Sequence, residues 1–276
     1  MQAARPDKST VIFKVVLGLL LYFITSALVI RFTTDGRSHA SIWPGNGIIL
    51  ALLLNRGLTL RKRVLCLTFL TDILAKSVVW PWTPWFCATA FLNVAEIALV
   101  AAFARFYTSH GKPFSTARTV LNFALIAGLA VPFVISIPGA FVTSIAHHTS
   151  FSLSFWEWLF STSFGLLIFT PMFTSLFGGQ FMHDLTENGS YPLWKIGIVL
   201  LCQAILAVLV FSQSAYPLLF IPAEALIISP MLIGEAGTTL SFMIITITGL
   251  AFTIDGKGPT SLIHTDHFKR EVLLQV

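Results

Sequence analysis

Residues 41–57, SIWPGNGIILALLLNRG, form the stretch that decides the fold of this chain. The stretch opens with an aromatic–proline pair, Trp43 and Pro44, continues with two glycines around Asn46, and runs through apolar residues to Arg56. The apolar run is one or two helical turns too short to span a bilayer. Half-length segments headed by glycine and proline in polytopic membrane proteins tend to line an internal cavity. We therefore expect this segment to contact whatever the protein binds or senses.

The composition is that of an integral membrane protein. Of the 276 residues, 55% are hydrophobic and 11% are charged, against roughly 25% charged residues in a soluble domain. The net charge of +5 does not indicate nucleic-acid binding, because no basic run is interleaved with aromatic residues. Cys66, Cys87 and Cys202 each lie inside an apolar run without CxxC spacing, which predicts neither a disulfide framework nor a metal site.

The apolar runs predict an all-α, polytopic transmembrane helix bundle of about nine crossings. The expected spans are Val11–Ile30, Ile42–Leu54, Val64–Trp80, Trp85–Phe106, Val120–Ile145, Phe155–Phe177, Leu193–Phe211, Tyr216–Ile233 and Thr238–Ile254. The second and eighth spans are short and headed by proline. The last two spans divide one apolar stretch of roughly 57 Å, because Pro230, Gly234 and Gly237 interrupt it. In the fifth span, Pro132 and Pro138 should kink the helix.

The end of the sequence predicts a missing closing helix. Residues 255–271 are polar, and residues 272–276 begin a new apolar run inside which the sequence stops. We therefore expect residues 1–276 to be a single integral-membrane domain that is truncated at the start of its final helix. The first apolar run is too long for a signal-peptide core and lacks a small-residue cleavage site, so it is expected to be retained as a span.

The distribution of lysine and arginine predicts a cytoplasmic N-terminus. Eleven of these residues fall on the side of the N-terminus, and three fall on the opposite side before the polar tail. The loop over residues 55–63 is then cytoplasmic, and the loop over residues 144–154 is external. Five tryptophans cluster at the external loops, as an interfacial belt would: Trp80, Trp82, Trp85, Trp156 and Trp158.

Two pairs of polar residues lie within the expected spans. Asp72 and Lys76 are four residues apart, so they share one helix face. The pair is either a wall of an internal polar cavity or a pair near the external boundary from which Lys76 reaches the lipid headgroups. Asn93 and Glu96 lie deeper, and Glu96 has no basic residue within one turn. Glu96 is therefore either protonated or partnered from another helix, in a ligand site or in a packing contact.

The two short helices carry polar residues at their starts. Trp43, Asn46 and Gly47 are either a ligand-contacting entry, in which the glycines permit close backbone approach, or a structural turn. Glu224 heads the second short helix, where the helix dipole alone would stabilise its charge. By alternation both helices start on the external side, so Asn46 and Glu224 are candidates for one shared cavity. The alternative is that the two short helices are unrelated and fill different gaps in the bundle.

No catalytic, metal or cofactor site is predicted. His147 and His148 are adjacent, and His264 and His267 lie in the polar tail with Asp266, but no carboxylate or cysteine has the spacing to complete a zinc set. The sequence also contains no GxSxG motif and no glycine-rich phosphate loop. It therefore does not predict an enzyme.

Five motifs in order resemble the MASE1 domain, a membrane-associated sensor module of bacterial signalling proteins. They are the SIWPGNGIILALLLNRG stretch, Asn93-Val94-Ala95-Glu96, the segment from Trp158 through Gly165 to Pro171, the segment from Pro222 to Gly237, and Gly256-Lys257-Gly258-Pro259 followed by Leu273-Leu274-Gln275. The resemblance covers nearly the whole chain. Two departures concern the family's frequent acidic residue, where Thr162 stands here, and its arginine near Gly234.

The resemblance implies a sensory input module in the bacterial inner membrane, which relays a ligand or membrane state to an output module. In that family the output is a cytoplasmic histidine kinase of two-component signalling or a diguanylate cyclase of cyclic-di-GMP signalling. Here it would act in cis or in trans, and neither output module is found in this sequence. The expected partners are the lipid bilayer, such an output module and a second copy of the chain, with no nucleic acid.

The residues expected to contact the signal are Trp43, Asn46, Gly47, Asp72, Asn93, Glu96, Trp158 and Glu224. A second function class is a transporter-like membrane subunit that binds a substrate, because short discontinuous helices and buried carboxylates also describe substrate sites.

Overall fold

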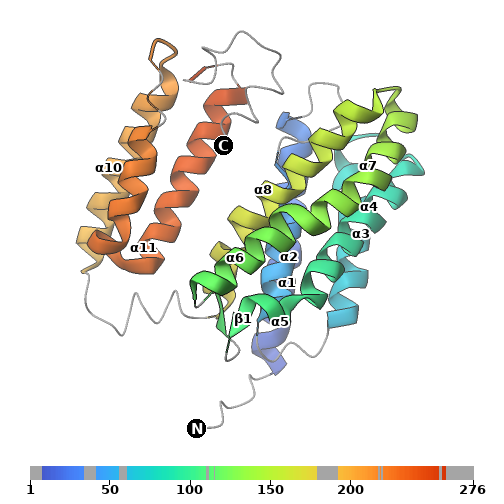
Figure 1. The fold of residues 1–276 in the computed structure, drawn as a ribbon, viewed down its shortest axis with the longest axis horizontal. Coiled ribbons are helices and arrows are strands. Elements are labelled where there is room, and N and C mark those ends of the chain that lie inside the picture. The colour runs from blue at the N-terminus through green and yellow to red at the C-terminus, as the bar shows by residue number, and fades with distance from the viewer. Residues whose placement is uncertain are drawn as a thin grey trace. The chain divides into compact units, whose positions relative to one another are not determined.

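The structure is a computed structural model that describes residues 8–33, 42–55, 61–109, 112–114, 116–178, 192–216, 218, 220–254 and 257–258. Figure 1 shows a chain built almost wholly of helices. The chain divides into two compact units, Met1–Gly178 and Gly179–Val276. The start of the expected closing helix and His264 and His267 lie outside the described residues.

The first unit contains the helices α1 to α8. They are α1 (Lys8–Thr33), α2 (Pro44–Leu54), α3 (Arg61–Val79), α4 (Trp85–Ala102), α5 (Ala104–Tyr107), α6 (Ala117–Leu125), the π-helix η1 (Ile126–Ala130), α7 (Val131–His147) and α8 (Phe151–Gly178). Two strands of two residues each, β1 (Thr108–Ser109) and β2 (Lys112–Pro113), pair in an antiparallel ladder. The predicted helix bundle is therefore confirmed for this unit, apart from this small ladder.

The short helix α2 is the centre of the first unit. Pro44 occupies its first turn, where the missing N–H costs no hydrogen bond. Every residue of α2 is buried, and its neighbours are α1, α4 and α8 (Figure 1). A helix that is apolar all round and surrounded by other helices belongs in a core. The polar residues at its start therefore face protein.

A proline explains the irregular helix between α6 and α7. Pro132 has no N–H to donate, and its ring would clash with the carbonyl group of residue 128 in a regular helix. The wider π-turn of η1, which includes Gly128, lies at this position. The predicted distortion at Pro132 thus takes the form of a π-bulge. Pro138 lies inside the regular helix α7.

The second unit contains the pair of helices α10 (Leu193–Ser212) and α11 (Phe220–Ile254), which lie side by side (Figure 1). The helix α11 is broken at Gly234, whose φ of 67° and ψ of −175° are not helical. This break confirms the prediction that the long apolar stretch is divided near Gly234. Gln203 of α10 donates a hydrogen bond of 2.5 Å to Ser229 of α11.

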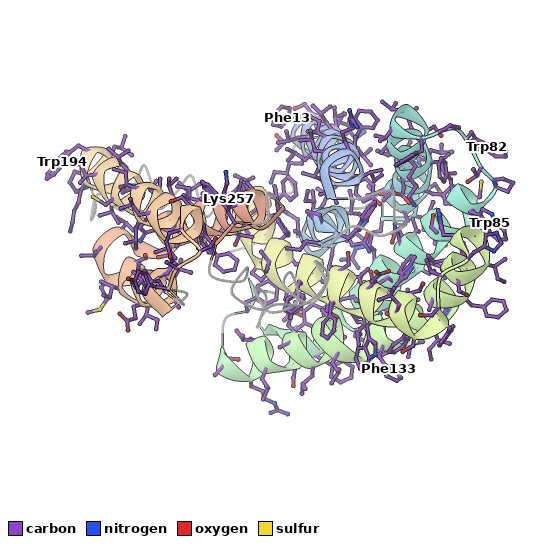
Figure 2. The ribbon with its side chains drawn as sticks, turned by 90° about the horizontal axis from the view of Figure 1, so that it is seen from above. Phe13, Trp82, Trp85, Phe133, Trp194 and Lys257 are labelled. Atoms are coloured by element: carbon purple, nitrogen blue, oxygen red, sulfur yellow. The ribbon has the colours of Figure 1, made fainter. Side chains whose placement is uncertain are left out.

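The number of crossings is not confirmed. Among the described residues, five helices are long and apolar enough to span a membrane: Lys8–Arg31, Trp85–Ala102, Ala117–His147, Phe151–Gly178 and Leu193–Ser212. Three further apolar helices among the described residues are shorter, including α2 and the two parts of α11. Figure 2 shows the side chains of Phe13 and Phe133 on the outer surface of the first unit, where they are 65% and 47% exposed. Such an apolar surface suits contact with lipid.

Candidate functional site

Asp72 and Lys76 of α3 form an ion pair inside the first unit. Lys76 Nζ lies 2.7 Å from Asp72 Oδ2, and Asp72 is fully buried while Lys76 is 9% exposed. The same ammonium donates to Thr89 of α4 at 2.8 Å and lies 5.6 Å from the centre of the Trp43 ring, a cation–π distance. The lysine therefore turns into the protein, which favours the polar-wall interpretation over the one in which it reaches the headgroups.

Glu96 finds its partner on the short helix. Asn46 Nδ2 donates a hydrogen bond of 2.5 Å to Glu96 Oε2, and both side chains are fully buried. This contact confirms the prediction that Glu96 is partnered from another helix, and the partner lies on the second of the expected spans. Thr162 of α8 also lies beside the Glu96 carboxyl group, at the position where the resemblance noted an acidic residue in relatives.

The two sets of contacts are linked by single helical turns. Asn93 Nδ2 donates to Asp72 Oδ2 at 3.2 Å, and Asn93 precedes Glu96 by three residues on α4. Trp43, beside Lys76, likewise precedes Asn46 by three residues at the start of α2. Residues three apart on a helix share a face. The Asp72–Lys76 pair and the Asn46–Glu96 pair are therefore two adjoining layers of one polar cluster.

Two residues of α1 that the sequence analysis did not single out belong to this cluster. Tyr22 and Ser26 are fully buried, and the Tyr22 hydroxyl group lies next to Asp72, Trp43 and Ser26 without a hydrogen bond of ordinary geometry. They are four residues apart, so they present two hydroxyl groups on one face of a largely apolar span. This four-residue spacing is the sequence feature from which a polar face of α1 could have been predicted.

Several buried polar atoms of the cluster have no hydrogen-bond partner among the described residues. They are Tyr22 Oη, Ser26 Oγ, Trp43 Nε1, Asn46 Oδ1, Asp72 Oδ1 and Glu96 Oε1. Each carboxylate accepts a hydrogen bond from another helix through one oxygen, and its other oxygen has no hydrogen-bond partner among the described residues. A buried polar atom without a partner is rare and costly. This concentration marks the cluster as the candidate site.

The remaining predicted site residues have different surroundings. Trp158 donates from Nε1 to Thr143 of α7 at 2.9 Å, and a Cβ atom on Gly139 would lie 2.6 Å from its ring. Its side chain therefore packs α8 on α7. Glu224 is exposed in the second unit, so the shared cavity with Asn46 would join the two units and stays a prediction. Among the described residues, no three His, Cys, Asp or Glu side chains come together as metal ligands.

Comparisons with known proteins identify one family. The sequence model of the MASE1 family matches residues 14–276 of the chain. No curated protein and no solved structure gives a significant match. The matched range includes α2, α4 and both layers of the polar cluster.

Proposed function

The chain belongs to the MASE1 family of membrane-associated sensory domains, and from this premise we propose that it is a bacterial sensory input module whose signal acts on the buried polar cluster. The cluster supports this proposal because ionisable residues inside a membrane protein are expensive and commonly mark functional sites. Asn46, Asp72 and Glu96 are fully buried and only partly hydrogen-bonded. A guest that contacts α2 and α4 differently in two states would shift the balance between them.

A second set of contacts suits the relay of such a shift. The carbonyl oxygen of Phe177, at the end of α8, accepts hydrogen bonds from Lys14 of α1 at 2.6 Å and from Asn55 after α2 at 2.5 Å. The last carbonyl groups of a helix lack partners within the helix, and a cation is favourable there. A movement of α2 would therefore shift the end of α8, where the chain passes from the first unit to the second.

We further propose that the two units form one sensor domain of the bacterial inner membrane, with a cytoplasmic N-terminus. The expected receivers of the signal are a histidine kinase or a diguanylate cyclase, in cis or in trans, and the module would act as a monomer or homodimer. The module itself would catalyse no reaction. The family match across both units supports the single domain.

The transporter-like alternative draws its support from the second unit. The helix α11 is interrupted at Gly234, and interrupted helices carry the substrate sites of many transporters. The two functions differ in their requirement for an output module. A sensor changes the activity of that module, whereas a transporter moves its substrate without it.

A fusion to a reporter enzyme tests the proposed function. Residues 1–276 are joined through a helical linker to the catalytic region of a diguanylate cyclase, and cyclic-di-GMP is measured in cells under a panel of growth conditions. Glu96→Gln keeps the size of the side chain but removes its charge. We expect this variant to produce a shifted cyclic-di-GMP level at equal amounts of membrane-inserted fusion.

Phe91→Leu is the matched control, since Phe91 lies on the same helix and is 65% exposed. It should give the wild-type level. If the Glu96→Gln fusion matches the wild type in every growth condition, the cluster does not govern output and the proposed function is wrong.

A further inference from the structure

Within the proposed function, on which this inference rests, we propose that the Asn46–Glu96 pair is the centre of a binding site for a small monovalent cation. The pair lies where α2, α4 and α8 meet: Asn46 donates to Glu96 at 2.5 Å, and Thr162 lies beside the carboxyl group.

An ionised Glu96 leaves the cluster one positive charge short, and either a proton or a bound cation would supply that charge. Asp72 is neutralised by Lys76, which lies 2.7 Å away. Glu96 is fully buried, and no lysine or arginine among the described residues pairs with it. The cluster thus holds two carboxyl groups and one ammonium group. A buried carboxylate without an opposite charge is strongly unfavourable, and a bound cation would neutralise it.

The buried oxygen atoms without hydrogen-bond partners also favour a cation as the guest. Asn46 Oδ1 and Glu96 Oε1 are buried oxygens without a partner among the described residues, and both accept rather than donate when Glu96 is ionised. The Asn46 amide nitrogen is already used. Two acceptors on side chains that already touch can share a metal ion or an ammonium group, whereas an anion would be repelled.

The size and the chemistry of the atoms limit the guest to a small ion. Asn46 and Glu96 are fully buried and Thr162 is 3% exposed, so the pair is enclosed by helices. The available atoms are a carboxylate, an amide oxygen and a hydroxyl oxygen. Oxygens of this kind suit hard cations. One carboxylate balances one positive charge, which favours a monovalent ion over a divalent one.

Direct binding of sodium to the purified chain tests the proposal. Residues 1–276 in lipid nanodiscs are titrated with ²²Na⁺ in N-methylglucamine chloride, and bound ²²Na⁺ is then displaced with sodium, potassium, ammonium or choline chloride. We expect saturable binding that small cations displace and choline does not. Unlabelled sodium should displace the label completely. Displacement by ammonium at a lower concentration than sodium or potassium would identify a guest that donates hydrogen bonds, and the reverse order would identify coordination by oxygen.

Variants at the pair give opposite expectations. Glu96→Gln should lose saturable binding, whereas Asn46→Asp, which adds a second carboxylate, should bind more tightly and unfold at a temperature that rises more steeply with sodium. Gln203→Met, which alters a buried polar residue of the second unit, should bind as the wild type does. Thermal unfolding in N-methylglucamine chloride checks that each variant is folded.

Absence of saturable binding to the wild type, or equal binding to Glu96→Gln, would overturn the cation site. These results are distinguishable from failure of the proposed function. If Glu96→Gln shifts the cyclic-di-GMP output but the wild type binds no cation, the proposed sensor function stands and the cation site is wrong. If the wild type binds the cation but Glu96→Gln does not change the output, the cation site stands and the proposed sensor function is wrong.

Discussion

Gly47 and Gly165 bring the backbones of α2 and α8 into direct contact. A Cβ atom on Gly47 would lie 2.5 Å from the carbonyl oxygen of Gly165, and one on Gly165 would overlap the carbonyl group of Trp43. The amide of Trp43 also donates to the carbonyl oxygen of Ser161 at 3.0 Å. Small residues permit such close approach of membrane helices. This contact fixes the start of α2, and with it the position of Asn46.

Alanine at either glycine should therefore destabilise the protein. Because the opposing atoms are backbone atoms that cannot turn aside, we expect Gly47→Ala or Gly165→Ala to lower the free energy of unfolding by about 1–3 kcal/mol. Gly178→Ala, on the same helix as Gly165 but with nothing within 4 Å of its added Cβ atom, is the control. Thermal unfolding in detergent, followed by circular dichroism, measures the difference. Equal stability of Gly165→Ala and Gly178→Ala would contradict the close contact.

The buried Asp72–Lys76 pair predicts that the stability of the protein depends strongly on keeping both charges or removing both. Lys76→Met would leave the buried Asp72 carboxylate without its cation, and breaking a buried pair costs about 3–5 kcal/mol. The double variant Lys76→Met with Asp72→Asn removes both charges and should recover much of this loss. Unfolding free energies of the single and double variants test the coupling. Lys62→Met, at an exposed position of α3, should be near the wild type, and additive effects at residues 72 and 76 would count against the pair.

The polar cluster shows what the sequence can and cannot predict. Asp72 and Lys76 could be paired from sequence because an interval of four residues on one helix fixes their geometry. The requirement that Glu96 find a partner also followed from its charge in an apolar span. The identity of that partner did not follow, since Asn46 is 50 residues away and its contact depends on how α2 packs between α4 and α8.

Other features were missed for related reasons. The four-residue spacing of Tyr22 and Ser26 marks one face of the first span, but their proximity to Asp72 is a result of packing. Trp158 was expected at the site, yet its indole nitrogen binds Thr143 of α7. An aromatic residue with one polar atom serves as well in packing as in binding, so sequence alone does not separate these roles.

Gly234 should be indispensable for the break in α11. Its φ of 67° and ψ of −175° lie in a region that is open almost only to glycine, and a side chain there costs about 1–3 kcal/mol. We expect Gly234→Ala to destabilise the second unit, as seen by faster hydrogen exchange of α11 amides. Gly197→Ala, in open space on α10, should instead leave exchange unchanged or slow it. Identical exchange in both variants would speak against the break.

The predicted orientation can be tested by cysteine labelling in intact cells. The exposed native Cys66, Cys87 and Cys202 are first replaced, and single cysteines are then placed at Thr149 and Ala117. The excess of basic residues on the N-terminal side predicts that Thr149 is external and Ala117 cytoplasmic. A membrane-impermeant maleimide should therefore modify Thr149→Cys only.

A cysteine at Thr59, which lies outside the described residues, should be protected like the one at Ala117. Permeabilised cells provide the control, because both cytoplasmic positions should then become reactive. Modification of Thr59→Cys and protection of Thr149→Cys in intact cells would reverse the orientation.

The last prediction joins the two units through Asn46 and Glu224. Glu224 is exposed in the second unit, and an exposed carboxylate on a membrane helix needs water or a polar partner. Both helix starts are expected on the external side. If the two starts converge, their dipoles meet, and the charge on Glu224 favours a neutral polar or weakly charged guest over an anion. A structure of the intact chain in nanodiscs, obtained by electron cryomicroscopy with a bound antibody fragment, would measure the distance between the two side chains. A short distance would support the shared cavity that the sequence predicts. A separation of several helix diameters, each about 10 Å, would end the shared-cavity idea and leave the polar cluster of the first unit as the whole site.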